Sequence, residues 1–495
     1  MRIALITLLV VCLTPFATAQ RAPLFTQDFS PEEFAARREA VYDAIGASGI
    51  ALLQGAPSPR GYTRFRQTNE FYYLTGVEVP HALVLLDGAS RSATLYLPHR
   101  NARREAGEGR MLAAEDTDFF SDLGYAGVYG PELLGEHLGR QLRRAGVTVF
   151  TPFSPAEGTA ESRDLGLRVN ADIASDPWDG RPTREAAFMQ LLEQRFPGIV
   201  LADLTPTLDA LRLVKSDGEL ALIRKATRLS GLALMEAARS TVPGIMEEEL
   251  DAVARYIFLR HGAQGDAYYS LIAGGPNAFF PHYHAGKSPL VDGELVLMDY
   301  APDVGYYMSD VTRMWPVNGR FSKEQRELYG FYLACYKAIL SHIRPEVTAA
   351  QIRREAVKDM DAAFAAASFT KPAHREAARA FVESYRAGSQ REDARLGHWV
   401  GMATHDVGDY TGPLKPGMVF TIEPALRVPE EMIYIRLEDL IIITEAGAEI
   451  VSDFVPMEIE DLERLMEEPG MLQDSAKELD AALMQALDPD MARKR

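Results

Sequence analysis

Long apolar runs are scarce in this sequence. A helix that spans a bilayer needs about 20 apolar residues in succession, and no run beyond residue 20 approaches that length. The first twenty residues contain a shorter run, Ile3–Leu13, which follows Arg2 and precedes the small-x-small site Ala17–Ala19. This order is typical of a signal peptide, so we expect residues 1–19 to be removed and the chain to be exported, either to the periplasm or to the medium. A membrane anchor is the alternative, and the shortness of the run argues against it.

Cysteine is also nearly absent, with Cys12 and Cys335 as the two examples among 495 residues. Cys12 lies in the expected signal peptide, which leaves Cys335 alone and excludes an internal disulfide in the mature chain. Cys335 lies in the apolar segment FYLACYKAIL, where we expect it to pack in a helix rather than act as a nucleophile. Stability must therefore come from packing, with metal binding or oligomerisation as further sources.

Basic residues are outnumbered, since 52 Lys and Arg stand against 70 Asp and Glu and the net charge is -18. An acidic chain repels polyanions, so the composition argues against a nucleic-acid partner and against docking on an anionic membrane. The hydrophobic content of 47% is ample for packed cores. We therefore expect folded domains that act on small or neutral partners.

The order of the predicted elements indicates two domains. Ser30–Glu33 has the capping Ser, first-turn Pro and third-position Glu of a helix start, and the strand-like runs GIALLQG, ALVLLD, ATLYLP and VTVFTP then alternate with helical stretches. A second capping box, Ser216 with Glu219, begins the helix that opens the next domain. We predict an α+β protein with an α/β domain at 26–200, a second domain at 210–460 and a charged helical tail at 461–495.

The segment LVLMDYAPDVGYYMSDVTRMW, residues 295–315, places two aspartates in a pattern typical of buried sheet. Asp303-Val304-Gly305 is a turn signal, so the segment is a predicted β-hairpin. A turn around Asp303–Val304 pairs position 299 near 308 and position 310 near 297. Asp299 and Asp310 then become diagonal neighbours on one face of the sheet.

A second predicted hairpin has the same anomaly. MVFTIEPAL and YIRLEDLIII flank a loop centred between Glu430 and Glu431, so Glu423 and Glu438 are expected to face each other. Like charges that face each other across a ladder are destabilising. Arg436 shares the face of Glu438 and can neutralise one carboxylate, but not four.

Divalent cations would remove this repulsion, because carboxylates that bridge two cations about 3.5–4 Å apart coordinate them instead of repelling each other. Solvated or salt-bridged acids on exposed strands are the alternative, and for a single Asp we would favour it. Histidines also cluster beside the acids: His282 and His284 precede the first hairpin, and His398 and His405 precede the second. Four acids and this clustering favour metal binding and acid–base chemistry.

Taken together, these residues resemble the metallopeptidase family of aminopeptidase P and prolidase, and within it the Xaa-Pro aminopeptidases. RQTNEFYYLTGVEVPHALVLL, residues 66–86, is similar to the family's N-terminal domain, and LVKSDGELALIRKA, residues 213–226, is similar to its inter-domain helix. The resemblance implies that the second domain has the pita-bread fold of creatinase and methionine aminopeptidase. It also implies peptide substrates with proline in the second position, and a homodimer or homotetramer.

The family's metal ligands fall, in order, on Asp299, Asp310, His398, Glu423 and Glu438. The resemblance implies two divalent ions, with Mn²⁺ as the expected metal, and places His282 and His405 in the substrate site. On chemical grounds Glu423 is our candidate for the group that accepts the proton of the attacking water. Arg436 and Thr312 are expected to lie behind the ligands and support them.

One position departs from the family pattern. Ala394 stands four residues before His398, where the family often has a histidine, so a substrate contact is either absent or supplied elsewhere, for instance by His284. Three functions therefore remain open from the sequence: an Xaa-Pro aminopeptidase, a dipeptidase of the prolidase type, and a non-peptidase binding protein on the same fold.

Overall fold

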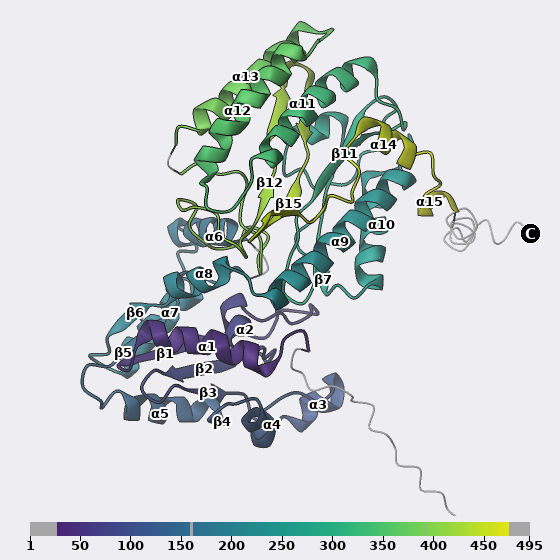
Figure 1. Cartoon of the computed structure of the whole chain (residues 1–495). Coiled ribbons are helices and arrows are strands. Elements are labelled where there is room, and N and C mark those ends of the chain that lie inside the picture. Colours follow the sequence, from purple (N-terminus) through teal and green to yellow (C-terminus); the bar gives the residue numbers. More distant parts are fainter. Residues whose placement is uncertain (1–26, 159–161, 392, 475–495) are drawn as a thin grey trace, which may run out of the picture.

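The computed structural model describes residues 27–158, 162–391 and 393–474. Two lobes are stacked in Figure 1, with the N-terminal elements in the lower lobe and the elements from α9 (Asp217–Ser240) onward in the upper one. The predicted signal peptide, residues 1–19, and the end of the predicted tail, residues 475–495, lie outside the described residues. Among the helices of the described ranges, none combines the length and the apolar character that a membrane crossing requires.

The lower lobe is built on one mixed sheet with the strand order β4-β3-β2-β1-β5-β6. Four of its strands coincide with the four predicted strand-like runs, as the α/β prediction requires. The strands are β1 (Gly49–Gln54), β2 (Leu83–Asp87), β3 (Ser92–Tyr96), β4 (Gly127–Tyr129), β5 (Thr148–Thr151) and β6 (Leu201–Asp203). The helices are α1 (Pro31–Ile45), α2 (Asn69–Thr75), α3 (Ala102–Glu108), α4 (Thr117–Asp122), α5 (Leu134–Gln141), α6 (Arg163–Ser175), α7 (Arg184–Arg195) and α8 (Thr205–Leu213).

The two predicted capping boxes have different outcomes. At the start of α9 the box forms: the Glu219 amide donates to Ser216 Oγ at 3.3 Å, and the Ser216 amide donates to Glu219 Oε2 at 2.8 Å. At the start of α1 the prediction is wrong, because the Ser30 side chain makes no capping hydrogen bond. The Glu33 carboxylate instead accepts from Arg37 at 3.1 Å and from the Ser216 hydroxyl at 2.6 Å, so it links α1 to α9.

The upper lobe places strands between two groups of helices, with α9 and α10 (Glu247–Arg260) on one flank and three helices, given below, on the other (Figure 1). One antiparallel sheet has the order β11-β9-β8 and another has the order β12-β15-β16. The strands are β7 (Gly265–Asp266), β8 (Leu271–Gly274), β9 (Leu295–Asp299), β10 (Pro302–Asp303), β11 (Thr312–Pro316), β12 (Val419–Ile422), β13 (Ala425–Val428), β14 (Ile433–Arg436), β15 (Asp439–Thr444) and β16 (Gly447–Ile450). The remaining helices are α11 (Lys323–Ser341), α12 (Ala349–Ala366), α13 (Pro372–Gly388), α14 (Ile459–Leu465) and α15 (Met471–Asp474).

The first acidic hairpin exists, but its predicted register is wrong. Asp299 pairs with Thr312, not with a residue near 308, because the chain reverses around Gly305–Tyr306, two residues later than predicted. Both of these residues have positive φ, 60° for Gly305 and 73° for Tyr306. The register shift of four is even, so every side chain keeps its face of the sheet. Asp299 and Asp310 therefore still belong to the same face.

The second hairpin has the predicted register. Ala425 pairs with Arg436 and Ile422 pairs with Asp439, and both pairs belong to one register in which position 423 faces position 438. The ladder is interrupted at Glu423-Pro424, where β12 ends before β13 begins. Proline has no amide hydrogen to donate to a ladder, which is consistent with a break at this point.

The two hairpins are joined at Thr312 and Glu438. The Thr312 amide donates to the Glu438 carbonyl at 3.3 Å, and the Glu438 amide donates to the Thr312 carbonyl at 3.1 Å. One residue along each strand, the buried Arg313 donates to Asp439 Oδ1 at 2.6 Å and to the Glu438 carbonyl at 2.8 Å. The Ser452 and Tyr336 hydroxyls also donate to Asp439, at 2.6 and 2.8 Å. This buried ion pair fastens the two sheets together.

Replacing Asp439 by Asn is expected to lower the free energy of unfolding by about 3–5 kcal/mol, because the Arg313 charge would remain buried without its counter-charge. Urea unfolding followed by circular dichroism measures the change. Asp361→Asn is the matched control, since it removes the same charge from an exposed pair with Arg386 and should leave the urea midpoint in place. Equal midpoints for the two variants would contradict the structural role of the Arg313–Asp439 pair.

Candidate metal centre

Each acid of the candidate site stands within two residues of the end of a strand. Asp299 is the last residue of β9, Asp310 comes two residues before β11, Glu423 follows β12 and Glu438 precedes β15. The backbone bridge between Thr312 and Glu438 brings these strand ends together. Carboxylates that are far apart in the sequence thus meet at the junction of the two sheets.

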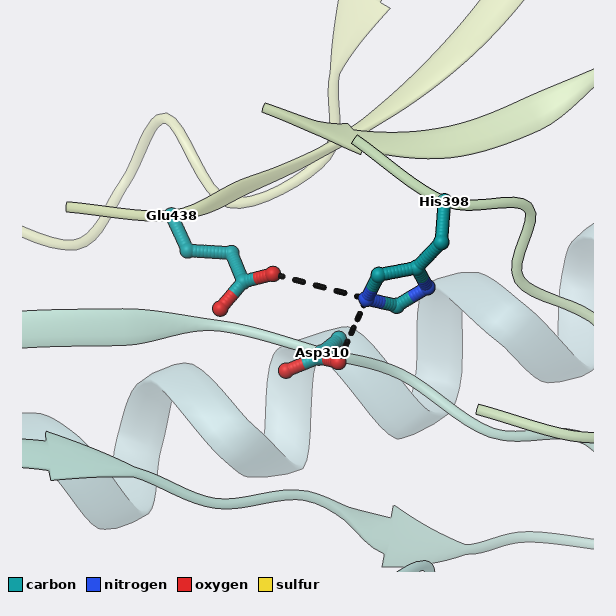
Figure 2. Close-up of side chains that lie close together, drawn as sticks. All are labelled: Asp310, His398 and Glu438. Atoms are coloured by element: carbon teal, nitrogen blue, oxygen red, sulfur yellow. Dashed lines mark ion pairs between the residues drawn. The ribbon is translucent and has the colours of Figure 1, made fainter. Parts of the chain in front are cut away.

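Figure 2 shows three of the predicted ligands, Asp310, His398 and Glu438, converging from separate segments. His398 Nε2 lies 3.4 Å from Asp310 Oδ2 and 3.9 Å from Glu438 Oε1. One ligand atom from each of the three lies within 4.8 Å of the others. Glu423 adds a fourth group, since its Oε1 lies 3.5 Å from His398 Nε2. Four of the five predicted ligands thus lie close together.

Asp299, the fifth predicted ligand, is held by Arg436 and by a tyrosine that the sequence analysis missed. Arg436 pairs with the Asp299 carboxylate and also lies 3.5 Å from Glu423 Oε2 and 3.8 Å from Glu438 Oε2. The Tyr268 hydroxyl lies 2.5 Å from Asp299 Oδ1 and 2.7 Å from Asp310 Oδ1, within hydrogen-bond distance of both. Tyr268 lies 31 residues before Asp299, outside both predicted hairpins, so no local pattern marks it.

Thr312 contacts one of the predicted ligands and its neighbouring arginine. Its hydroxyl donates to Glu438 Oε2 at 2.7 Å and accepts from Arg436 Nη2 at 3.0 Å. The hydroxyl is therefore fixed from both sides, and it orients the Glu438 carboxylate. Contacts of this kind hold ligands in place in metal sites.

The cluster carries more negative charge than its protein partners neutralise. Burial and the neighbouring carboxylate of Asp299 raise the pKa of Asp310 well above its usual range, and burial together with Asp310 and Glu423 does the same to the pKa of Glu438. Glu438 Oε1 is buried and has no hydrogen-bond partner among the described residues. Carboxylate oxygens and an imidazole nitrogen suit divalent ions such as Mn²⁺ and Zn²⁺. The residues present therefore fit a divalent metal.

The two predicted substrate-site histidines both lie beside the cluster. The His405 ring lies against the His398 ring, with centroids 3.9 Å apart and planes at 32°. Partial burial and the positive charge of Arg436 lower the pKa of His282, while Asp299 and Glu423 act in the opposite direction. His282 thus lies within electrostatic range of Arg436, Asp299 and Glu423.

His284 and Ala394 contribute less to this arrangement. Ala394 is buried and has no polar side chain with which to contact a substrate. His284 is exposed, its ring lies 4.4 Å from the Tyr269 ring, and its Nδ1 lies 2.9 Å from the His282 carbonyl. The suggestion that His284 replaces the family's further histidine remains a prediction.

Comparison with known proteins agrees with this geometry. Residues 221–445 match the metallopeptidase family M24, and residues 34–150 match the N-terminal domain of aminopeptidase P. The chain is 30% identical to the Xaa-Pro aminopeptidase of Haemophilus influenzae over 458 residues, which covers 88% of this chain and 97% of that one. It is 29% identical to the Xaa-Pro aminopeptidase of Escherichia coli over 460 residues, which covers 89% and 98% of the two chains.

A solved structure extends the comparison to the whole fold. Escherichia coli aminopeptidase P with the inhibitor Pro-Leu matches with a TM-score of 0.71 and 27% identity, over 89% of this chain and 98% of that chain. The predicted fold, an N-terminal α/β domain followed by a pita-bread domain, is thereby confirmed. The acid cluster, the two matched domains and the full-length relatives together establish that the chain belongs to the metallopeptidase family M24, as a metallo-aminopeptidase of the aminopeptidase P type.

Proposed function

We propose that this chain removes the first residue from peptides that have proline in the second position, with two divalent ions held by Asp299, Asp310, His398, Glu423 and Glu438. The observation that carries the proposal is the convergence of Asp310, His398 and Glu438 within 4.8 Å, with Asp299 and Glu423 beside them. Similarity to Xaa-Pro aminopeptidases over nearly their full length supports an aminopeptidase over a dipeptidase. The complete donor set argues against a binding protein without peptidase chemistry.

Bound divalent ions, Mn²⁺ by resemblance, would supply Lewis acidity and a lowered pKa of water, which peptide hydrolysis at neutral pH requires. The chain's own residues prepare the place for this chemistry. Tyr268 ties Asp299 to Asp310, and Thr312 fixes the Glu438 carboxylate. Donor atoms that are held before the reaction need little reorganisation during it.

Glu423 is the acid best placed to move a proton. Its side chain is 26% exposed, whereas those of Asp299, Asp310 and Glu438 are 5%, 6% and 1% exposed. A partly exposed carboxylate at the edge of the cluster can accept a proton from water and pass it on. Catalysis by a general base of this kind is worth about 10²–10⁴-fold in rate.

His282 and His405 are the proposed donors to the substrate. As in any amide hydrolysis, the nitrogen of the bond before proline must gain a proton as that bond breaks, and this tertiary amide nitrogen carries no hydrogen of its own. Imidazole titrates near neutral pH and can deliver that proton or donate a hydrogen bond to the developing oxyanion. The His405 ring lies against the ring of His398, and His282 lies within electrostatic range of Asp299 and Glu423.

We also propose that the chain is exported after cleavage behind Ala19 and forms a homodimer or homotetramer. The support for export is the pattern of Arg2, the short apolar run and Ala17–Ala19. The support for self-association is the resemblance alone. N-terminal sequencing of the native protein tests export, and an intact Met1 chain would contradict it. Light scattering tests self-association, and a monomer near 53 kDa (about 54.7 kDa less the signal) would contradict that.

Metal loading is the first test of the function. The purified mature protein should bind two equivalents of Mn²⁺ per chain, lose its activity on dialysis against a chelator and regain it when Mn²⁺ is returned. Elemental analysis gives the stoichiometry and a proline-containing peptide gives the activity. Less than one equivalent bound, together with full activity in chelator, would overturn the metal assignment.

Two substitutions separate a ligand from a substrate-site residue. Glu423→Gln removes a ligand charge and the proton acceptor, so metal content should fall and turnover should drop by about 10²–10⁴-fold. His405→Ala should leave both metal equivalents bound and lower turnover by about 10–10³-fold through a lost transition-state hydrogen bond. The assignment is wrong if His405→Ala strips the metal while Glu423→Gln keeps full activity.

Substrate length distinguishes the two peptidase alternatives. The enzyme should hydrolyse a tripeptide Xaa-Pro-Yaa with a higher kcat/KM than the dipeptide Xaa-Pro, because an aminopeptidase must accept chain beyond the proline. Chromatography of the released first residue measures the rate on each substrate, with the same metal loading in both assays. A preference for the dipeptide would identify the chain as a prolidase.

A further inference from the structure

Helix α6 belongs in sequence to the lower lobe, but its N-terminus contacts the loop of the upper lobe that carries His398 and His405, here called the active-site loop. In Figure 1, α6 lies at the level where the two lobes meet, above α8. Ser162 forms a parallel bridge with His405, and the Arg163 amide donates to the His405 carbonyl at 2.9 Å. The N-terminal lobe therefore holds the backbone of a predicted substrate-site residue.

The next residue of α6 reaches the side chain of the same histidine. Asp164 Oδ2 lies 3.5 Å from His405 Nδ1, and the His405 ring rests on His398. His405 is thus held at its backbone carbonyl, at its ring face and at Nδ1. A carboxylate at Nδ1 favours the tautomer that carries its hydrogen there, which leaves Nε2 as the nitrogen available to another partner.

We propose that Asp164 is a positioning residue for the reaction: it holds His405 by its Nδ1–H, so that Nε2 is presented to the substrate. This inference rests on the role of His405 in the proposed function. Among the described residues, the ion pair that Asp164 forms is with His405. Its influence on the reaction passes through the imidazole.

A buried ionic network fixes the base of this contact. Arg163 donates to Glu70, Glu157 and Asp209 at 3.0, 3.1 and 3.1 Å. On the other side of His405, Asp406 accepts from Arg212 at 2.6 Å and from Lys215 at 3.2 Å.

Arg212 also donates to Glu70 and Glu157, which Arg163 contacts too, so a single hydrogen-bonded network connects Arg163 with Asp406. The network is well shielded from water: Arg163, Arg212 and Asp406 are 8%, 1% and 4% exposed. Asp164 thus projects from a firmly placed helix end, as a positioning group requires.

The inference is tested with Asp164→Asn in the full-length, metal-loaded protein. We expect kcat on the proline-containing tripeptide to fall by about 3–10-fold, a modest loss because the contact is partly exposed. KM, metal content and melting temperature should stay within error. Asp172→Asn, which removes the same charge from an exposed position on α6, is the matched control and should match the wild-type chain.

A double-mutant cycle shows whether Asp164 acts through His405. In a His405→Ala background, Asp164→Asn should cause no further loss, because the ring that it positions is gone. The same fold-loss in both backgrounds, or a wild-type kcat for Asp164→Asn, would overturn the inference and leave the proposed function intact. Full activity of His405→Ala alone would overturn the catalytic role of His405, and the positioning role with it.

Discussion

The rest of this structure depends on the crowding of four carboxylates at the junction of two β-hairpins. Asp299, Asp310, Glu423 and Glu438 meet there, with Arg436 as the cation that contacts three of them. Such a cluster repels itself unless positive charge is added, and a buried oxygen of Glu438 has no hydrogen-bond partner within the described chain. The surrounding fold has to hold these groups together against that repulsion. Successive side chains of a β-strand point to opposite faces of the sheet. Thr312 and Glu438 therefore meet on the side of the acid cluster, whereas the next residues, Arg313 and Asp439, form a buried ion pair that joins the two sheets.

The acid cluster and the junction of the two sheets therefore depend on the same contacts. Backbone bonds between Thr312 and Glu438 set the separation of the hairpins, so the same contact that joins the sheets fixes the distances between ligands. The break in the ladder at Pro424 leaves the neighbouring Glu423 at the end of a strand, and Glu423 is more exposed than the other three acids. The cluster is thus mostly buried and closed, with one acid at its edge. That asymmetry suits a centre in which some carboxylates hold charge and one moves protons.

The sequence alone predicted those parts of the site whose geometry is set within a single hairpin. The register of the second hairpin followed from its apolar flanks and short loop, and Glu423 and Glu438 were placed opposite each other in that register. The predicted register of the first hairpin was wrong by four positions, because its turn includes Tyr306. That ring stacks on Tyr72 of the lower lobe, with centroids 3.6 Å apart, and no local rule could supply this contact. Tyr268 and Asp164 were missed for the same reason: each reaches its partner across the fold, and neither stands in a motif.

These long-range contacts also assign a role to the lower lobe. Tyr72 stacks on the turn of the first hairpin, Arg66 pairs with Asp303 in that hairpin at 3.0 Å, and the Arg163 amide holds the carbonyl of His405. Interfaces between domains are commonly polar and permit relative motion, but the ionic network around Arg212 is buried, and removing one partner of such a network is costly. Movement of the lower lobe would therefore disturb the first hairpin and the active-site loop together. The N-terminal lobe thus helps to shape the candidate metal centre and is not an independent attachment to it.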